Sequence, residues 1–415
     1  MTIDSHHDTP ADVTGSIADM AHPGRLPTRA EVRAIIPDDC FERSTARSLL
    51  YLGGSLALVT ALVVGAALWL PMTWAWLPAW MLYAVLTGTA AVGLWVIAHE
   101  CGHGAFSPHS RLQDAIGFVL HTALLVPYFS WQRSHSVHHA KTNHLDEGET
   151  HVPVRACSAD GSARRAERRL LGRNVATVVV IARALLFGWP AYLLAGTTGG
   201  PARGRSNHFW PARPFTTELF PARWHARVWA SSAAVLAVIA ALVAWSIAAG
   251  SVVPVLLLYV GPYLVVNAWL VTYTWLQHTD VDIAHFADPD WSWLRGAFQT
   301  VDRPYGRVVD LLHHRIGSTH VAHHIDHRIP HYHAARATTA ISASFPQWYR
   351  YDPTPVPLAL WRVGRDCVAV EDHDIGWYFL EPASRVTLPS DSSHERGRLD
   401  GRADRGPFTR RSTGR

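Results

Sequence analysis

The sequence WAWLPAWMLYAVLTGTAAVGLWVIAHECGH occupies residues 74–103 and decides the fold. Residues 74–98 carry no charged side chain and are longer than the roughly 20 helical residues that cross the hydrocarbon core of a membrane. His99 and His103 follow at once, four positions apart, so both imidazoles lie on one face of the same helix. Because histidine is the commonest metal ligand, the stretch predicts a membrane-spanning helix that ends in a metal site.

Three more apolar runs, 49–70, 228–249 and 252–276, are long enough to cross a membrane. The first of them is separated from the span quoted above only by the short tip Pro71-Met72-Thr73. The other two are almost contiguous, so the four runs are predicted to form two tight hairpins.

Positive charge lies outside these hairpins. The hairpin tips carry none, whereas the arginines lie before residue 49 and in the segments 99–227 and 277–415. By the positive-inside rule, those segments face the cytosol. The prediction is therefore an all-α, multi-pass integral membrane protein with about four transmembrane helices and a cytosolic helical cap that carries the histidines.

Two weaker apolar runs, 112–129 and 175–195, are interrupted by His121, by Arg183 or by proline. They predict helices that lie on the membrane or enter it only partly. A third spanning hairpin is the alternative.

The composition agrees with a few spans that carry a large polar part. Hydrophobic residues make up 48% of the 415 residues, and the mean hydropathy is +0.04. The net charge is only +4, so no nucleic-acid partner is expected. We predict a disordered tail (1–44), a membrane domain (45–345), a cytosolic C-terminal extension (346–384) and a second disordered tail (385–415).

Histidines gather in three clusters among the 26 in the chain. A chance HxxHH pattern is expected roughly 0.1 times in a chain of this composition, yet it occurs twice. Each spacing places the imidazoles of a cluster on one helical face. Eight imidazoles exceed what one ion binds, so two metal ions are predicted. The predicted ligands are His99, His103, His135, His138, His139, His320, His323 and His324.

His278 ends the fourth span at the same predicted depth as His99, and we predict it to be a ninth ligand. Three carboxylates, those of Glu100, Asp280 and Asp302, are candidates to support the ligands through hydrogen bonds, with Asp280 orienting an imidazole. Other histidines are expected to be solvated, to cap helices or to support ligands: His109, His121, His144, His151, His208, His225, His285, His327, His331 and His333.

A pair of redox metal ions beside apolar spans suits the attack on an aliphatic C–H bond. That reaction requires a strong oxidant made from O₂, and two irons can share the electrons, while neutral imidazoles suit iron. The spans would align an acyl chain at a fixed depth beneath the metals.

Two alternatives stay open. HECGH at 99–103 also matches the HExxH motif of zinc metalloproteases, in which the glutamate is the general base. A protease, however, needs one further ligand rather than six. A non-enzymatic metal carrier is the other alternative, but it would place its ligands within the spans.

These motifs, in this order, resemble those of membrane fatty acid desaturases, most closely the delta-12/omega-3 acyl-lipid type. The resemblance extends from about residue 45 to 345. One departure is Gly104, where many plant relatives carry another histidine. The matching text is HECGHGAFS (99–107), PYFSWQRSHSVHHAKTN (127–143), QHTD (277–280), WLRGAFQTVDRPYG (293–306) and HRIGSTHVAHHIDHRIPHYHA (314–334).

The resemblance implies two iron ions held by the eight clustered histidines, with an additional histidine ligand at the position of His278. It also implies O₂ as co-substrate and a fatty acyl substrate linked to lipid, acyl carrier protein or CoA. The electrons would come from a separate donor such as a ferredoxin or cytochrome b5. Hydroxylases and acetylenases share these motifs, so the resemblance leaves the outcome of the reaction open.

Overall fold

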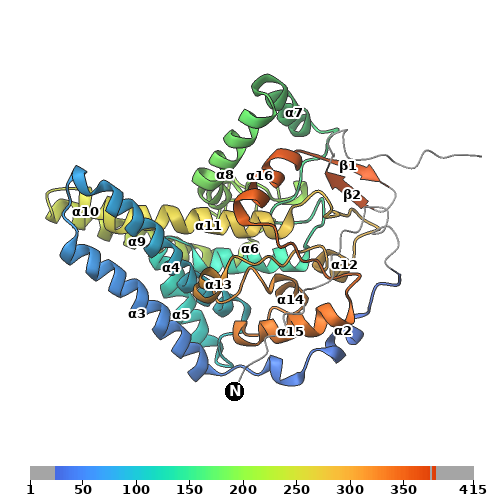
Figure 1. The fold of residues 1–415 in the computed structure, drawn as a ribbon, viewed down its shortest axis with the longest axis horizontal. Coiled ribbons are helices and arrows are strands. Elements are labelled where there is room, and N and C mark those ends of the chain that lie inside the picture. The colour runs from blue at the N-terminus through green and yellow to red at the C-terminus, as the bar shows by residue number, and fades with distance from the viewer. Residues whose placement is uncertain (1–23, 374–375, 380–415) are drawn as a thin grey trace, which may run out of the picture. The chain divides into compact units, whose positions relative to one another are not determined.

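The computed structural model describes residues 24–373 and 376–379, which are mostly helical (Figure 1). The tail predicted at 385–415 lies outside the described residues. In chain order the elements are α2 (Arg29–Ile35), η1 (Asp38–Phe41), α3 (Thr45–Trp69), η2 (Trp74–Trp76), α4 (Leu77–His103), α5 (Ser110–Ala123), α6 (Tyr128–Ala140), α7 (Ala159–Leu171), α8 (Arg173–Ala195), η3 (Pro201–Arg203), η4 (Ala222–Trp224), α9 (His225–Ala248), α10 (Val253–Val255), η5 (Leu256–Val260), α11 (Gly261–His278), α12 (Trp293–Ala297), α13 (Arg307–Leu312), α14 (His320–Ile325), α15 (His331–Ser344), α16 (Val356–Asp366), β1 (Val370–His373) and β2 (Gly376–Phe379).

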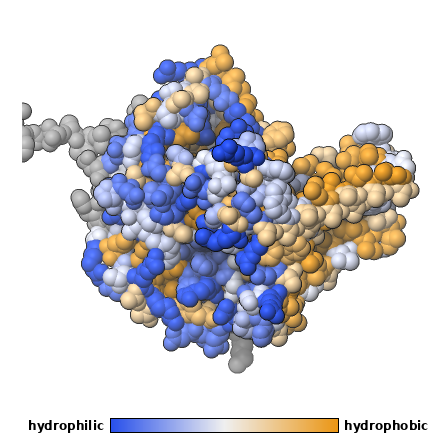
Figure 2. All heavy atoms as spheres, turned by 180° about the vertical axis from the view of Figure 1, so that it is seen from behind, coloured by the Kyte–Doolittle hydropathy of each residue, from blue (hydrophilic) through white to orange (hydrophobic). Residues whose placement is uncertain are grey.

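Four long apolar helical stretches follow the predicted spans. α3 precedes α4, and α9 precedes the helical stretch Val253–His278, which comprises α10, η5 and α11. α4 packs against α3 and α11. Gly88 permits the close approach of α4 to α11, because a Cβ there would lie 2.6 Å from the Pro262 carbonyl oxygen. Outward-facing Leu68 and Trp69 are 69% and 77% exposed, and Figure 2 shows apolar residues gathered over these helices.

Helix α8 differs from the prediction for residues 175–195. It is one helix of 23 residues, long and apolar enough to span a membrane, so the described residues contain five candidate spans. Arg183 does not interrupt it, because its guanidinium pairs with Glu167 of α7 at 3.1 Å. α8 packs against α11 and α16, and in Figure 1 it rises away from the two hairpins.

The other weak run, 112–129, is broken within its length. The helix predicted there ends at Ala123, and α5 and α6 are bent by 105° relative to each other. Leu125 has a positive φ of 55°, and Pro127 stands directly before α6. The bend lets α6 carry the second histidine cluster away from the direction of α5.

Residues 29–41 lie in the stretch predicted to be a disordered tail, and there the prediction is wrong. Thr28 closes a capping box at the start of α2, which satisfies backbone N–H groups of the first turn. Val32, Ile36 and Cys40 follow at intervals of four and are buried against α12, α14 and α15. Burial of this apolar stripe offsets the entropy lost by ordering the segment.

The chain after α11 folds around a buried ion network. Arg303 is fully buried, and its guanidinium donates to Asp280 at 2.7 Å and pairs with Asp352. Arg362 of α16 pairs with the same two carboxylates. Two cations and two carboxylates balance their charges, as buried ions require. The predicted extension, 346–384, contains α16 and the antiparallel pair β1–β2.

Candidate metal centre

Four helices position the predicted ligands. α4 ends with the first cluster, and Gly104 stops it in a left-handed conformation (φ 77°) that glycine adopts without strain. α6 carries the second cluster near its end, and α14 carries the third. His278 is the last residue of α11. The clusters therefore converge because each stands at or near a helix end.

Five imidazoles form the first group. One ring nitrogen from each of His99, His103, His135, His139 and His323 lies within 4.8 Å of the others. Nε2 of His99 lies 2.9 Å from Nε2 of His135 and 3.2 Å from Nε2 of His103. This group draws on all three clusters.

His138, His278 and His324 form the second group, again within 4.8 Å of one another. Nε2 of His278 lies 3.2 Å from Nε2 of His138 and 3.0 Å from Nε2 of His320, so His320 adjoins this group. The rings of His139 and His324 stack with centroids 4.2 Å apart, which places the two groups side by side. The structure thus brings all nine predicted ligands together.

The spacing of the ring nitrogens fits metal coordination. Two imidazole nitrogens at right angles about an ion, each ~2.1 Å from it, lie ~3 Å apart. The Nε2–Nε2 distances of 2.9–3.2 Å agree with this. Nε2 of His323 and Nε2 of His324 are buried without a hydrogen-bond partner, and a bound ion would satisfy them. Each group could therefore hold a metal ion.

Burial keeps the third cluster in the ligand form. Desolvation, followed by repulsion from neighbouring imidazoles, lowers the pKa of His320, His323 and His324 well below the ordinary value of 6.5. These side chains are therefore neutral at physiological pH, and the neutral imidazole is the form that binds a metal ion.

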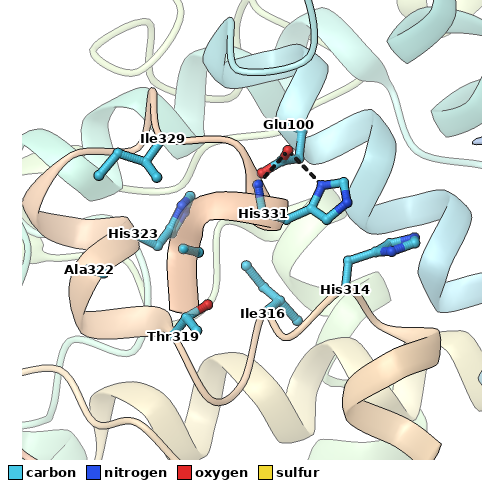
Figure 3. Close-up of a pocket in the computed structure, with 9 residues that line it drawn as sticks. Glu100, His314, Ile316, Thr319, Ala322, His323, Ile329 and His331 are labelled. Atoms are coloured by element: carbon cyan, nitrogen blue, oxygen red, sulfur yellow. Dashed lines mark hydrogen bonds and ion pairs between the residues drawn. The ribbon is translucent and has the colours of Figure 1, made fainter. Parts of the chain in front are cut away.

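Glu100 ties the first cluster to α15. Its carboxylate accepts hydrogen bonds from the backbone N–H of His331 at 3.0 Å and from Nδ1 of His331 at 2.9 Å. Figure 3 shows this pair at a small pocket that His314, Thr319 and His323 also line. The carboxylate is thus held by two donors, whereas a metalloprotease would use it as a general base on water.

The two aspartates have different partners. Asp302 accepts hydrogen bonds from the Val321 N–H at 2.7 Å and from the Tyr349 hydroxyl at 2.8 Å, so it holds the start of α14. Burial raises the pKa of Asp302 to about 7. The sequence predicts that Asp280 orients an imidazole, but its carboxylate instead accepts hydrogen bonds from the guanidinium groups of Arg303 and Arg362 in the cap.

Sequence reasoning missed several side chains that contact the predicted ligands, and Thr142 and Trp131 are two of them. The Thr142 hydroxyl lies 3.0 Å from Nδ1 of His324, and the ring of Trp131 stacks on the ring of His135 with centroids 4.5 Å apart. Both stand four positions from a histidine of the second cluster, so helical spacing was the available signal. Among the other histidines, His327 lies against the ring of His103, with centroids 4.7 Å apart.

Two apolar helices, α4 and α11, end beside two groups of imidazoles that could hold metal ions, as in a membrane protein with a metal centre. A family model described as fatty acid desaturase matches residues 74–355. The chain is 38% identical to a delta(12)-acyl-lipid-desaturase of Punica granatum, over 85% of this chain and 90% of the relative. It is 38% identical to a delta(12)-fatty-acid desaturase of Arabidopsis thaliana (82% and 87% covered) and 37% identical to a delta(12)-oleate desaturase of Trichosanthes kirilowii (85% and 95% covered).

The chain therefore belongs to the fatty acid desaturase family and is most like its delta-12 members. It is an oxidoreductase that desaturates fatty acids. The hydroxylase, acetylenase and zinc-protease alternatives are not favoured, because the relatives named above are desaturases and the histidines form two groups rather than one zinc site.

Proposed function

We propose that this enzyme uses O₂ and two iron ions to introduce a double bond at the delta-12 position of a fatty acyl chain. The observation that carries the proposal is the pair of adjacent histidine groups beside the ends of the apolar helices α4 and α11. The position of the double bond is supported by the names of relatives that share 37–38% of residues over most of the chain.

The two groups divide the proposed ligands. The first group would hold one iron through His99, His103, His135, His139 and His323. The second would hold the other iron through His138, His278 and His324, with His320 adjoining them. Bound iron supplies the means to reduce O₂ and to oxidise a C–H bond.

Aromatic residues shield the first group on the side of the span. The rings of Trp95 and Trp131 each lie 5.5 Å from the ring of His99, and His121 packs against both of them. Because these side chains exclude water, an acyl chain that enters from the membrane would meet the centre in an apolar environment.

The centre is proposed to face the cytosol, because the arginines lie on the segments that carry the histidines. The substrate would be a fatty acyl group linked to lipid, acyl carrier protein or CoA. A separate one-electron donor, such as a ferredoxin or cytochrome b5, would supply two electrons for each double bond.

The test is to express the chain in cells that contain oleate and to measure fatty acids by gas chromatography with mass spectrometry. We expect a second double bond at the delta-12 position and about two irons per purified chain. A His323→Ala variant should lose the product and retain less iron. An oxygenated product would show that the enzyme hydroxylates the acyl chain and would overturn the proposed desaturation. One zinc per chain, no iron and an unchanged lipid profile would overturn the whole proposal.

A further inference from the structure

Thr142 is a buried residue just beyond the end of α6, and its hydroxyl group has two partners. The residue is 2% exposed. Its Oγ1 donates to the backbone carbonyl oxygen of His138 at 2.8 Å and lies 3.0 Å from Nδ1 of His324. The hydroxyl therefore lies between two ligands proposed for the second metal group, one on α6 and the other on α14.

The carbonyl of His138 decides where the hydroxyl hydrogen points. α6 ends at Ala140, so this carbonyl is one of those that a helix end leaves without an intrahelical N–H. In the described part of the chain no other backbone N–H reaches it, and a buried carbonyl without a donor is costly. The hydroxyl has a single hydrogen to donate. That hydrogen therefore goes to the carbonyl, and Oγ1 accepts a hydrogen bond from Nδ1 of His324.

The other nitrogen of His324 agrees with this arrangement. When Nδ1 carries the ring hydrogen, Nε2 has the free lone pair with which a neutral imidazole binds a metal ion. Nε2 of His324 is buried without a hydrogen-bond partner, and the residue belongs to the second metal group. The opposite tautomer would bury an N–H at Nε2 without an acceptor and would also leave the carbonyl of His138 without its donor.

Packing holds Thr142 in place. Its own carbonyl oxygen accepts a hydrogen bond from the indole N–H of Trp291 at 2.9 Å. A Cβ on Gly296 of α12 would collide with the same carbonyl oxygen, and α12 also packs against α14. The end of α6, α12 and α14 therefore fix the position of the hydroxyl relative to the ring of His324.

His324 differs in this respect from the other proposed ligands. In the described part of the chain, it is the ligand whose Nδ1 lies within hydrogen-bonding distance of another side chain. Nδ1 is buried without a partner in His99, His139, His278 and His320. Asp280, which was predicted to orient an imidazole, pairs with arginines instead.

We propose that Thr142 is a positioning residue that fixes the tautomer and the ring orientation of His324 for metal binding in the second group. This inference rests on the proposed function and deepens it, because it names a residue that acts on one of the two metal sites. Loss of a hydrogen bond to the second nitrogen of a metal-binding histidine typically costs about 10- to 100-fold in metal affinity or activity. Removal of the Thr142 hydroxyl should therefore weaken the second site and leave the first site unchanged.

The test compares Thr142→Val with a matched control, Thr177→Val in α8. Thr177 is also 2% exposed, and its hydroxyl donates to the Arg173 carbonyl oxygen at the same 2.8 Å, but it has no imidazole partner in the described residues. Anaerobic titration of metal-free protein with Fe²⁺, followed by Mössbauer spectroscopy, measures the occupancy of each site. We expect Thr142→Val to weaken one of the two sites about 10- to 100-fold. Thr177→Val, and Thr142→Ser, which keeps the hydroxyl, should bind iron as the wild type does.

Thermal unfolding separates positioning from a general loss of stability. Without metal, the two valine variants should unfold at similar temperatures, because each loses one bond from a hydroxyl to a carbonyl. Added Fe²⁺ should then stabilise Thr142→Val less than Thr177→Val, because a ligand stabilises the folded state more when it binds more tightly. Thr142→Ala gives the same comparison if Thr142→Val does not fold.

Equal iron affinity of the two valine variants, or weak binding by Thr142→Ser, would overturn the positioning role alone. A wild-type chain that binds no iron and forms no double bond would overturn the proposed function and the positioning role with it.

Discussion

At the scale of single residues, Glu149, a buried residue in the loop between α6 and α7, makes stability depend on pH. Burial raises the pKa of Glu149 from 4.5 to about 8. Between these pH values the folded chain holds a proton that the unfolded chain has released. The free energy of unfolding contributed by this group is therefore fully present below pH ~4.5 and falls as the pH rises to about 8. Glu149→Gln removes this dependence, which thermal unfolding of metal-free protein from pH 5 to 8.5 would measure; equal pH slopes in both proteins would contradict the prediction.

The residues of the site differ in how far the sequence predicts them. The nine histidines were predictable because their spacing, or their place at the end of a span, indicates where they lie on a helix. Away from the site, the buried hydrogen bond between the Tyr192 hydroxyl of α8 and the Glu149 carboxyl group was not predictable, because 43 positions separate the two residues and the packing of α8 brings them together. A carboxylate in a polar loop normally indicates solvent exposure, and nothing local in the sequence indicates that this one is buried.

At the scale of elements, docking of the N-terminal segment depends on a small apolar stripe. Val32→Ala removes part of a side chain that is 2% exposed, which should destabilise the docked α2 by about 2 kcal/mol. Limited trypsin digestion should then cleave faster after Arg33 and Arg43. Val64→Ala, at a position in α3 that is 48% exposed, is the control and should leave cleavage unchanged. Equal cleavage of both variants would show that the segment does not depend on this contact.

The elements also show why apolar runs predict spans better than they predict short helices. Long uncharged runs produced helices near the predicted bounds. α8 is longer than predicted because an ion pair with α7 accommodates Arg183. α2 forms where a disordered tail was predicted because its packing partners lie about 250 to 310 positions away, in α12, α14 and α15. Contacts between distant segments override local patterns, and a single sequence does not contain that information.

At the scale of the whole molecule, the metal groups do not follow the sequence clusters. Each group combines histidines from different helices, so that neighbours such as His138 and His139, or His323 and His324, belong to different groups. Adjacent residues on a helix point about 100° apart, which lets one helix serve two ions. The centre therefore depends on the relative placement of α4, α6, α11 and α14.

The ion network of Arg303 provides part of that placement, because it joins the chain just after His278 to α16. Arg303→Gln would leave Asp280 and Asp352 with one cation, and the loss of a buried partner should cost about 3–5 kcal/mol. Arg183→Gln removes an ion pair whose side chains are 55% and 36% exposed, and should cost less than about 1 kcal/mol. Thermal unfolding and iron content would be measured for both variants. If the two destabilise equally, with iron retained in both, the network does not hold the end of α11 in place; if only Arg303→Gln loses stability and iron, the cap and the metal centre form one cooperative unit.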